Sequence, residues 1–134
     1  MNMETTINTE LQSHFLRLYQ IACADQNFDV LEMKQLYKFA EERGVETEHL
    51  DNILKHPVHE LEVPKSIEKR IEYLYDLAIM IWVDKEVTED EYNLLKKYCG
   101  TFEFLPENLN EICDYLIDCA KQDKQLHEVL DSIN

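Results

Sequence analysis

Apolar residues recur at three- and four-residue spacing along nearly the whole chain, and very little in the sequence interrupts that pattern. Only two glycines and three prolines occur among the 134 residues, and these are the residues that most often end or bend a helix. No stretch of alternating apolar and polar residues is long enough for a useful strand. The sequence therefore predicts an all-α fold.

Capping and stop signals divide this pattern into about six to seven helices. We expect Pro64 to stand in the first turn of the fourth helix and Pro106 to open the sixth. Residues 77–83 are apolar on nearly every face, so the fourth helix is the candidate for the central, most buried element. The expected helices cover residues 7–24, 29–43, 47–56, 64–84, 88–100, 106–120 and 126–133.

The chain is long enough for one hydrophobic core but short for two, and no Gly-, Ser- or Pro-rich linker divides it. We therefore expect residues 1–134 to form a single compact bundle. An internal repeat further predicts two related helix-turn-helix halves, at about residues 7–56 and 64–120.

The repeat appears when the sequence is shifted on itself by 59 residues. In both copies a long helix ends at an Asp, a three-residue connection follows, and a Glu stands at the third position of the next helix. A competing register, three residues shorter, keeps the apolar faces together but separates the acids, and the sequence leaves both open. The acid-preserving register pairs Leu18 with Leu77, Asp25 with Asp84, Glu32 with Glu91 and Leu36 with Leu95.

These two turns, Asp25 to Glu32 and Asp84 to Glu91, resemble the paired acidic turns of the TerB-like tellurite-resistance family, which have the form Asp, six residues, Glu. The resemblance covers about Phe15 to Gly100. It implies a helical fold of about seven helices, an acidic cluster proposed to hold a divalent cation, and a role in chemical-stress response.

The candidate metal ligands are Asp25, Glu32, Asp84 and Glu91. Carboxylates from two neighbouring turns could together supply the oxygen ligands of calcium or manganese, and zinc is a further candidate. The alternative is purely local: Glu32 and Glu91 close capping boxes, while the two aspartates hydrogen-bond within their own turns.

The overall charge narrows the class of partner. Asp and Glu number 28 against 13 Lys and Arg, which gives a formal charge of −15. Such a surface repels nucleic acids and anionic bilayers, so we expect another protein as partner and no membrane insertion. The oligomeric state stays open.

The sequence also predicts a cytoplasmic location. Residues 1–10 lack the basic and apolar parts of a secretion signal. The longest apolar run, residues 77–83, is far too short to cross a bilayer. The four cysteines contain no CxxC pair and stand in apolar helical patterns, as buried, reduced thiols do. They are Cys23, Cys99, Cys113 and Cys119.

No nucleophile, phosphate-loop or HExxH motif occurs, so we expect no enzyme activity, no catalytic residues and no cofactor beyond a possible divalent cation. His56 and His59 lack further ligands at zinc-binding spacing. Two hypotheses remain. The first is a TerB-like cation-binding domain with a stress-response or scaffold role, and the second is a metal-independent interaction module with an acidic docking surface.

Overall fold

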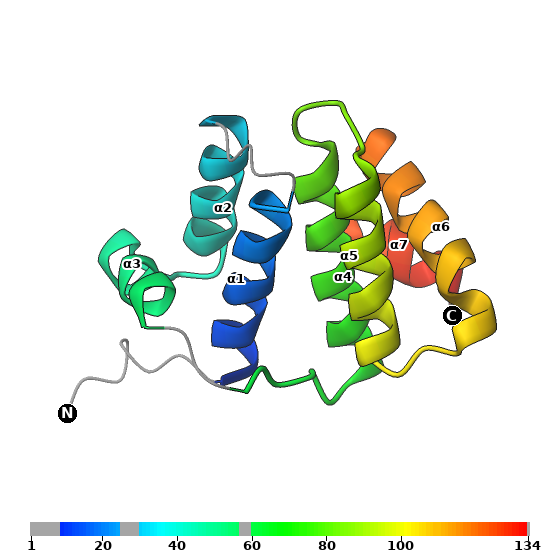
Figure 1. Cartoon of the computed structure of the whole chain (residues 1–134), viewed down its shortest axis with the longest axis horizontal. Helices are drawn as coiled ribbons and strands as arrows, with labels where there is room; N and C mark the ends of the chain where they lie inside the picture. Colours follow the sequence, from blue (N-terminus) through cyan, green and yellow to red (C-terminus); the bar gives the residue numbers. More distant parts are fainter. Residues whose placement is uncertain (1–8, 25–29, 57–59, 134) are drawn as a thin grey trace.

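In the computed structural model, residues 9–24, 30–56 and 60–133 are described, and they contain seven α-helices and no strand (Figure 1). The prediction of an all-α bundle is confirmed. No helix within these ranges combines the length and apolar character needed to span a membrane. The helices are α1 (Thr9–Ala22), α2 (Val30–Glu42), α3 (Thr47–Lys55), α4 (Ile67–Trp82), α5 (Glu89–Thr101), α6 (Leu109–Lys121) and α7 (Leu126–Ile133).

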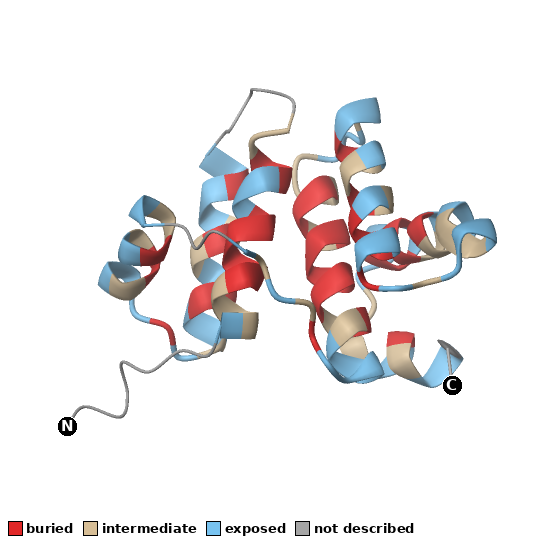
Figure 2. Cartoon of the chain, turned by 60° about the horizontal axis from the view of Figure 1, so that its bottom comes forward, coloured by how far each residue is buried: buried red, intermediate tan, exposed pale blue. Residues whose placement is uncertain are grey.

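Helix α4 is the central element, as its apolar sequence predicts. It contacts α1, α2, α5, α6 and α7, and Figure 2 shows the buried residues gathered where the helices face one another. Because the helix is surrounded, apolar side chains on several of its faces are removed from water. Its fully buried apolar residues include Leu74, Leu77, Ala78, Met80 and Ile81.

Two helix starts differ from expectation. Pro64 precedes α4 rather than standing in its first turn, because Ser66 is the cap and its side chain accepts a hydrogen bond from the Lys69 amide. Pro106 opens a short 3₁₀ turn, η2 (Pro106–Asn108), and α6 begins only at Leu109. A proline fits the first turn of either helix type, since that amide has no partner within the helix.

The cysteines are free thiols, as predicted. Cys99, Cys113 and Cys119 lie in the core. Cys23 is only half-buried, because it follows the last turn of α1 instead of lying on the inward face of that helix.

Candidate functional site

The two predicted acidic turns follow equivalent helices. Helix α1 contacts α2, and α4 contacts α5. Figure 1 places the end of α1, the start of α2 and the α4–α5 connection at the same end of the molecule. The start of α2 and the α4–α5 connection therefore lie at the same end of the molecule.

In the second turn, Asp84 is tied to its own backbone. Its Oδ1 accepts a hydrogen bond from the amide of Glu86 at 3.1 Å. Between them, Lys85 adopts a left-handed conformation with φ of 67°, and its amide donates to the carbonyl oxygen of Trp82 at 2.8 Å. These bonds end α4 and turn the chain toward α5, which is the local role foreseen for Asp84.

Glu91 closes the predicted capping box at the start of α5. Its Oε1 accepts from the Thr88 amide at 2.9 Å and from the Thr88 hydroxyl at 3.0 Å, and its own amide donates to Thr88 Oγ1 at 3.1 Å. The side chain is nonetheless only 1% exposed. Glu91 is therefore a buried carboxylate held by its own helix start.

Of the two predicted ligands in the first acidic turn, only Glu32 lies within the described residues. It lies in the first turn of α2 and is also only 1% exposed, like its repeat partner Glu91. Asp25 and the expected cap Asp29 lie outside the described residues, so the set of four ligands stays a prediction.

Within the described ranges, no three Asp, Glu, His or Cys side chains gather closely enough to hold a metal ion. Glu32, Asp84 and Glu91 thus do not form such a group by themselves. His56 is exposed at the end of α3, and its neighbour His59 lies outside the part of the chain that the structure describes.

Beside the second turn, α5 and α6 enclose a hollow of about 370 Å³. Apolar surface from Val87, Tyr92 and Ile117 lies in it next to the carboxylates of Asp114 and Asp118. The hydroxyl of Tyr92 donates to Asp114 Oδ1 at 2.8 Å, which fixes the ring against the acid. Lys121 completes the lining. We call these six residues the acidic hollow.

The surroundings of the acidic hollow are strongly negative. The turn that supplies Val87 also carries Glu86, Glu89 and Asp90, all exposed. Two lysines, Lys85 and Lys121, stand near the ring of Trp82 at 5.5 and 5.0 Å from its centroid. Acids outnumber these cations, so the field at this end attracts cationic groups.

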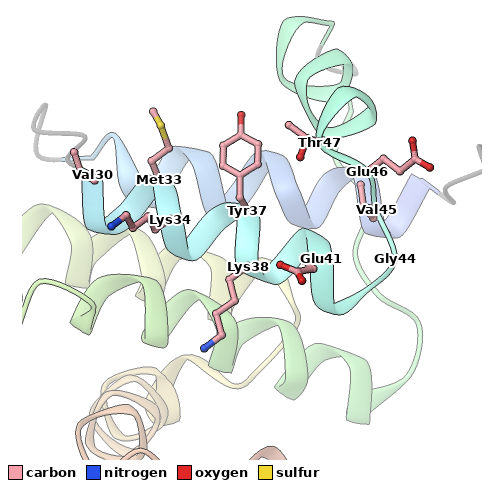
Figure 3. Close-up of a pocket in the computed structure, with 10 residues that line it drawn as sticks. All are labelled: Val30, Met33, Lys34, Tyr37, Lys38, Glu41, Gly44, Val45, Glu46 and Thr47. Atoms are coloured by element: carbon pink, nitrogen blue, oxygen red, sulfur yellow. The ribbon is translucent and has the colours of Figure 1, made fainter.

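A larger groove of about 900 Å³ runs along α2 to the start of α3. Figure 3 shows Met33 and Tyr37 pointing to one side of α2 while Lys38 points away from them. Its charges are mixed, because two lysines and two glutamates line it: Lys34, Lys38, Glu41 and Glu46. The groove therefore selects neither an acidic nor a basic partner.

Sequence reasoning missed a polar cluster inside the bundle. His14 Nε2 lies 2.9 Å from Asp76 Oδ2, and Arg43 reaches the same oxygen at 2.6 Å and Glu72 Oε2 at 2.9 Å. The ring of His14 stacks on Tyr73 at a centroid distance of 3.9 Å. These residues come from α1, α4 and the turn that follows α2, so no local spacing in the sequence predicts the cluster.

Burial controls the protonation of this cluster. Removal from water lowers the pKa of His14 below its ordinary 6.5, and its hydrogen bond to Asp76 only partly opposes this. Burial would also lower the pKa of Arg43, but the carboxylates of Asp76 and Glu72 outweigh it and raise that pKa. Burial likewise raises the pKa of Tyr73 to about 12. The cluster therefore holds a neutral imidazole beside a compensated ion pair.

A buried His–Asp pair is also a common arrangement for proton transfer. Here, however, His14 has no exposed surface, and its ring is covered by Tyr73. A cavity of about 460 Å³ reaches Arg43, Glu72 and Asp76, but His14 is not among its lining residues. The pair is therefore placed to join helices rather than to meet a substrate.

Comparison of the sequence with known protein families and with curated proteins, and of the fold with solved structures, finds no match.

Proposed function

We propose that this chain is a non-catalytic, metal-independent interaction module that docks a basic segment of another protein at the acidic hollow. The observation that carries the proposal is apolar surface from Val87, Tyr92 and Ile117 set among carboxylates at one end of α5 and α6. Apolar contact supplies affinity in such a site, and complementary charge supplies orientation and partner choice.

The charge of the whole chain supports the same class of partner. At −15 the molecule attracts cationic segments over a distance of about 8 Å at physiological salt. The matching ligand is a peptide with one apolar anchor and flanking Lys or Arg side chains. A cytoplasmic location is part of the proposal, since four free cysteines suit a reducing compartment.

The test uses a synthetic helical peptide with leucines on one face and lysines on the other, titrated into the ¹⁵N-labelled chain. We expect resonance shifts that centre on Val87, Tyr92 and Ile117, weaken steeply with added salt and persist in chelator. A peptide with glutamates in place of the lysines should not bind. Shifts spread over the whole surface, or binding that is insensitive to salt, would contradict the proposal.

Matched variants separate the hollow from overall charge. Asp114→Asn with Asp118→Asn removes two charges inside the hollow, whereas Glu41→Gln with Glu42→Gln removes two exposed charges on α2. We expect the first pair to weaken peptide binding much more than the second. Equal losses would mean that net charge alone attracts the peptide.

A second function, cation binding by the paired turns, is supported by one specific observation. Glu32 and Glu91 are each the third residue of their helices, α2 and α5, and both are 1% exposed. Figure 1 shows that the two helices begin at the same end of the molecule. Burying two carboxylates is costly unless a cation or hydrogen bonds compensate them. The resemblance to TerB-like domains adds a role in chemical-stress response, such as tellurite resistance, to this alternative.

Thermal melting with calcium, manganese or zinc tests the alternative, because an ion that binds only the folded chain raises the melting temperature by mass action. The rise should vanish in Asp25→Ala and in Glu32→Gln. Each variant is compared with and without metal, so that any loss of stability caused by the substitution itself cancels. An equal rise in both variants and in the unaltered chain, or no rise at millimolar metal, would remove this function.

A further inference from the structure

Two cysteines from different helices meet in the core between α5 and α6. The sulfur atoms of Cys99 and Cys113 lie 3.9 Å apart, and neither side chain has exposed surface. A disulfide bond needs the sulfurs at about 2.05 Å, so the gap to be closed is about 1.9 Å. Closing this gap requires rotation about the two Cα–Cβ bonds and a small movement of one helix.

Helices α5 and α6 also pack against each other beside the pair. Gly100 follows Cys99 directly, and Leu109 on α6 comes within 3.6 Å of the point where a Cβ of Gly100 would stand. The side chain of Leu109 thus packs against α5 beside Cys99, so the two helices are in contact near the cysteine pair.

The two thiols also differ in character. The hydrogen bond between them lowers the pKa of Cys113 and raises that of Cys99. Cys113 therefore forms the thiolate more readily, and the Cys99 thiol lies in contact with it.

The residues that follow the two cysteines are exposed, although both thiols are buried. Gly100 and Thr101, which follow Cys99, are exposed, and so is Asp114, which follows Cys113. A small oxidant therefore needs only a local opening of the last turn of α5, and not unfolding of the bundle.

We propose that Cys99 and Cys113 form a peroxide-sensitive dithiol that closes into a disulfide linking α5 to α6. The Cys113 thiolate attacks hydrogen peroxide, so that an S–O bond forms, the O–O bond breaks and hydroxide leaves. The sulfur of Cys99 then attacks the Cys113 sulfur, the S–S bond forms, the S–O bond breaks, and water leaves with the proton of Cys99. Two thiols and one peroxide give one disulfide and two waters.

The experiment treats the folded, full-length chain with hydrogen peroxide, then unfolds it and alkylates the remaining thiols. We expect intact mass to report two unmodified cysteines fewer, and peptide mapping to link the peptides of Cys99 and Cys113. Dithiothreitol should reverse the change, and the oxidised chain should melt at a higher temperature because the cross-link restricts its unfolded state.

Three variants complete the test. Cys23→Ser with Cys119→Ser should form the disulfide as the unaltered chain does. Cys99→Ala should form none, and neither should Cys113→Ala. If any variant fails to fold, the peptide map of the unaltered chain still decides. Four free thiols after peroxide, a link involving another cysteine, or a disulfide that forms only in denaturant would overturn the proposal.

Discussion

The imidazole of His14 on α1 lies 2.9 Å from the carboxylate of Asp76 on α4, and both side chains are inside the bundle. Arg43, at the end of α2, binds the same carboxylate oxygen at 2.6 Å. One carboxylate thus joins helices from both predicted halves of the chain. Because apolar packing is not directional, a buried polar contact of this kind favours one mutual arrangement of the helices over others.

The lowered pKa of His14 makes folding stability depend on pH. The unfolded chain protonates this imidazole near pH 6.5, whereas the folded chain protonates it only at lower pH. The stabilising contribution is therefore present above pH 6.5 and is lost as the pH falls from 6.5 toward the folded pKa. The slope reaches at most about 1.4 kcal/mol per pH unit for one proton. Urea unfolding between pH 7.5 and 5 measures it.

Substitution of the histidine isolates this effect from the many carboxylates. His14→Gln should remove the additional slope below pH 6.5, although it also lowers the stability at neutral pH. His127→Gln, at an exposed position on α7, is the matched control variant. Equal slopes in the unaltered chain and in His14→Gln would show that the imidazole of His14 is not kept neutral by burial.

Loss of Arg43 should be costly, because it leaves Asp76 and Glu72 without their shared cation. The exposed fractions of the Arg43 and Asp76 side chains are 18% and 10%, so water replaces the lost partner only in part. Arg43→Met keeps the aliphatic stem and should lower the free energy of unfolding by about 2 to 4 kcal/mol.

Lys69 provides the matched control, since it pairs with the same Glu72 at 3.4 Å but its side chain is 50% exposed. Lys69→Met should cost no more than about 0.5 kcal/mol. Chemical denaturation of both variants compares a buried cation with an exposed one on the same carboxylate. Similar losses would mean that burial does not set the strength of the Arg43 contacts.

The helices were predictable because their signals are local. Thr88 and Glu91 stand three residues apart in the sequence, and the capping box that this spacing predicts is present. The apolar run from Leu77 likewise identified α4 as the central helix, since burial on all sides requires apolar residues on all sides.

The polar cluster could not be predicted in the same way. His14 and Asp76 are 62 residues apart, and each alone looks like an ordinary polar residue on an amphipathic helix. Only the packing of α1 on α4 turns the two into a buried pair. The one local signal is a polar or charged residue at a position where the helical pattern calls for an apolar one. This signal marks a buried polar residue but does not identify its partner.

The capping box of α5 gives a prediction that separates its structural role from cation binding. Thr88→Ala removes the hydroxyl that accepts from the Glu91 amide at 3.1 Å, and should cost about 1 kcal/mol. Glu91→Gln keeps an oxygen that can accept from the Thr88 amide, so it should cost less than Glu91→Ala. Thermal and urea unfolding measure the three variants.

If Glu91 served mainly as a metal ligand, the order of stability of the two Glu91 variants would change once metal is present. Glu91→Gln would then lose the metal-dependent part of the stability as fully as Glu91→Ala does. Measurement in chelator and in calcium therefore compares the two roles in the same variants.

The two glycines should respond in opposite directions to alanine. Gly44 has φ of +71°, and among the described residues other than its chain neighbours no atom lies within 4 Å of the point where a Cβ would stand. Gly44→Ala therefore meets backbone strain and should cost about 1 kcal/mol. Gly100 is helical, and its added methyl would stand in ordinary contact with Leu109 at 3.6 Å. Gly100→Ala should therefore stabilise by up to about 1 kcal/mol, because alanine restricts the unfolded chain. Urea unfolding of the two variants side by side measures both effects. A loss of stability in Gly100→Ala would mean that α5 and α6 need a closer approach there than a methyl group permits.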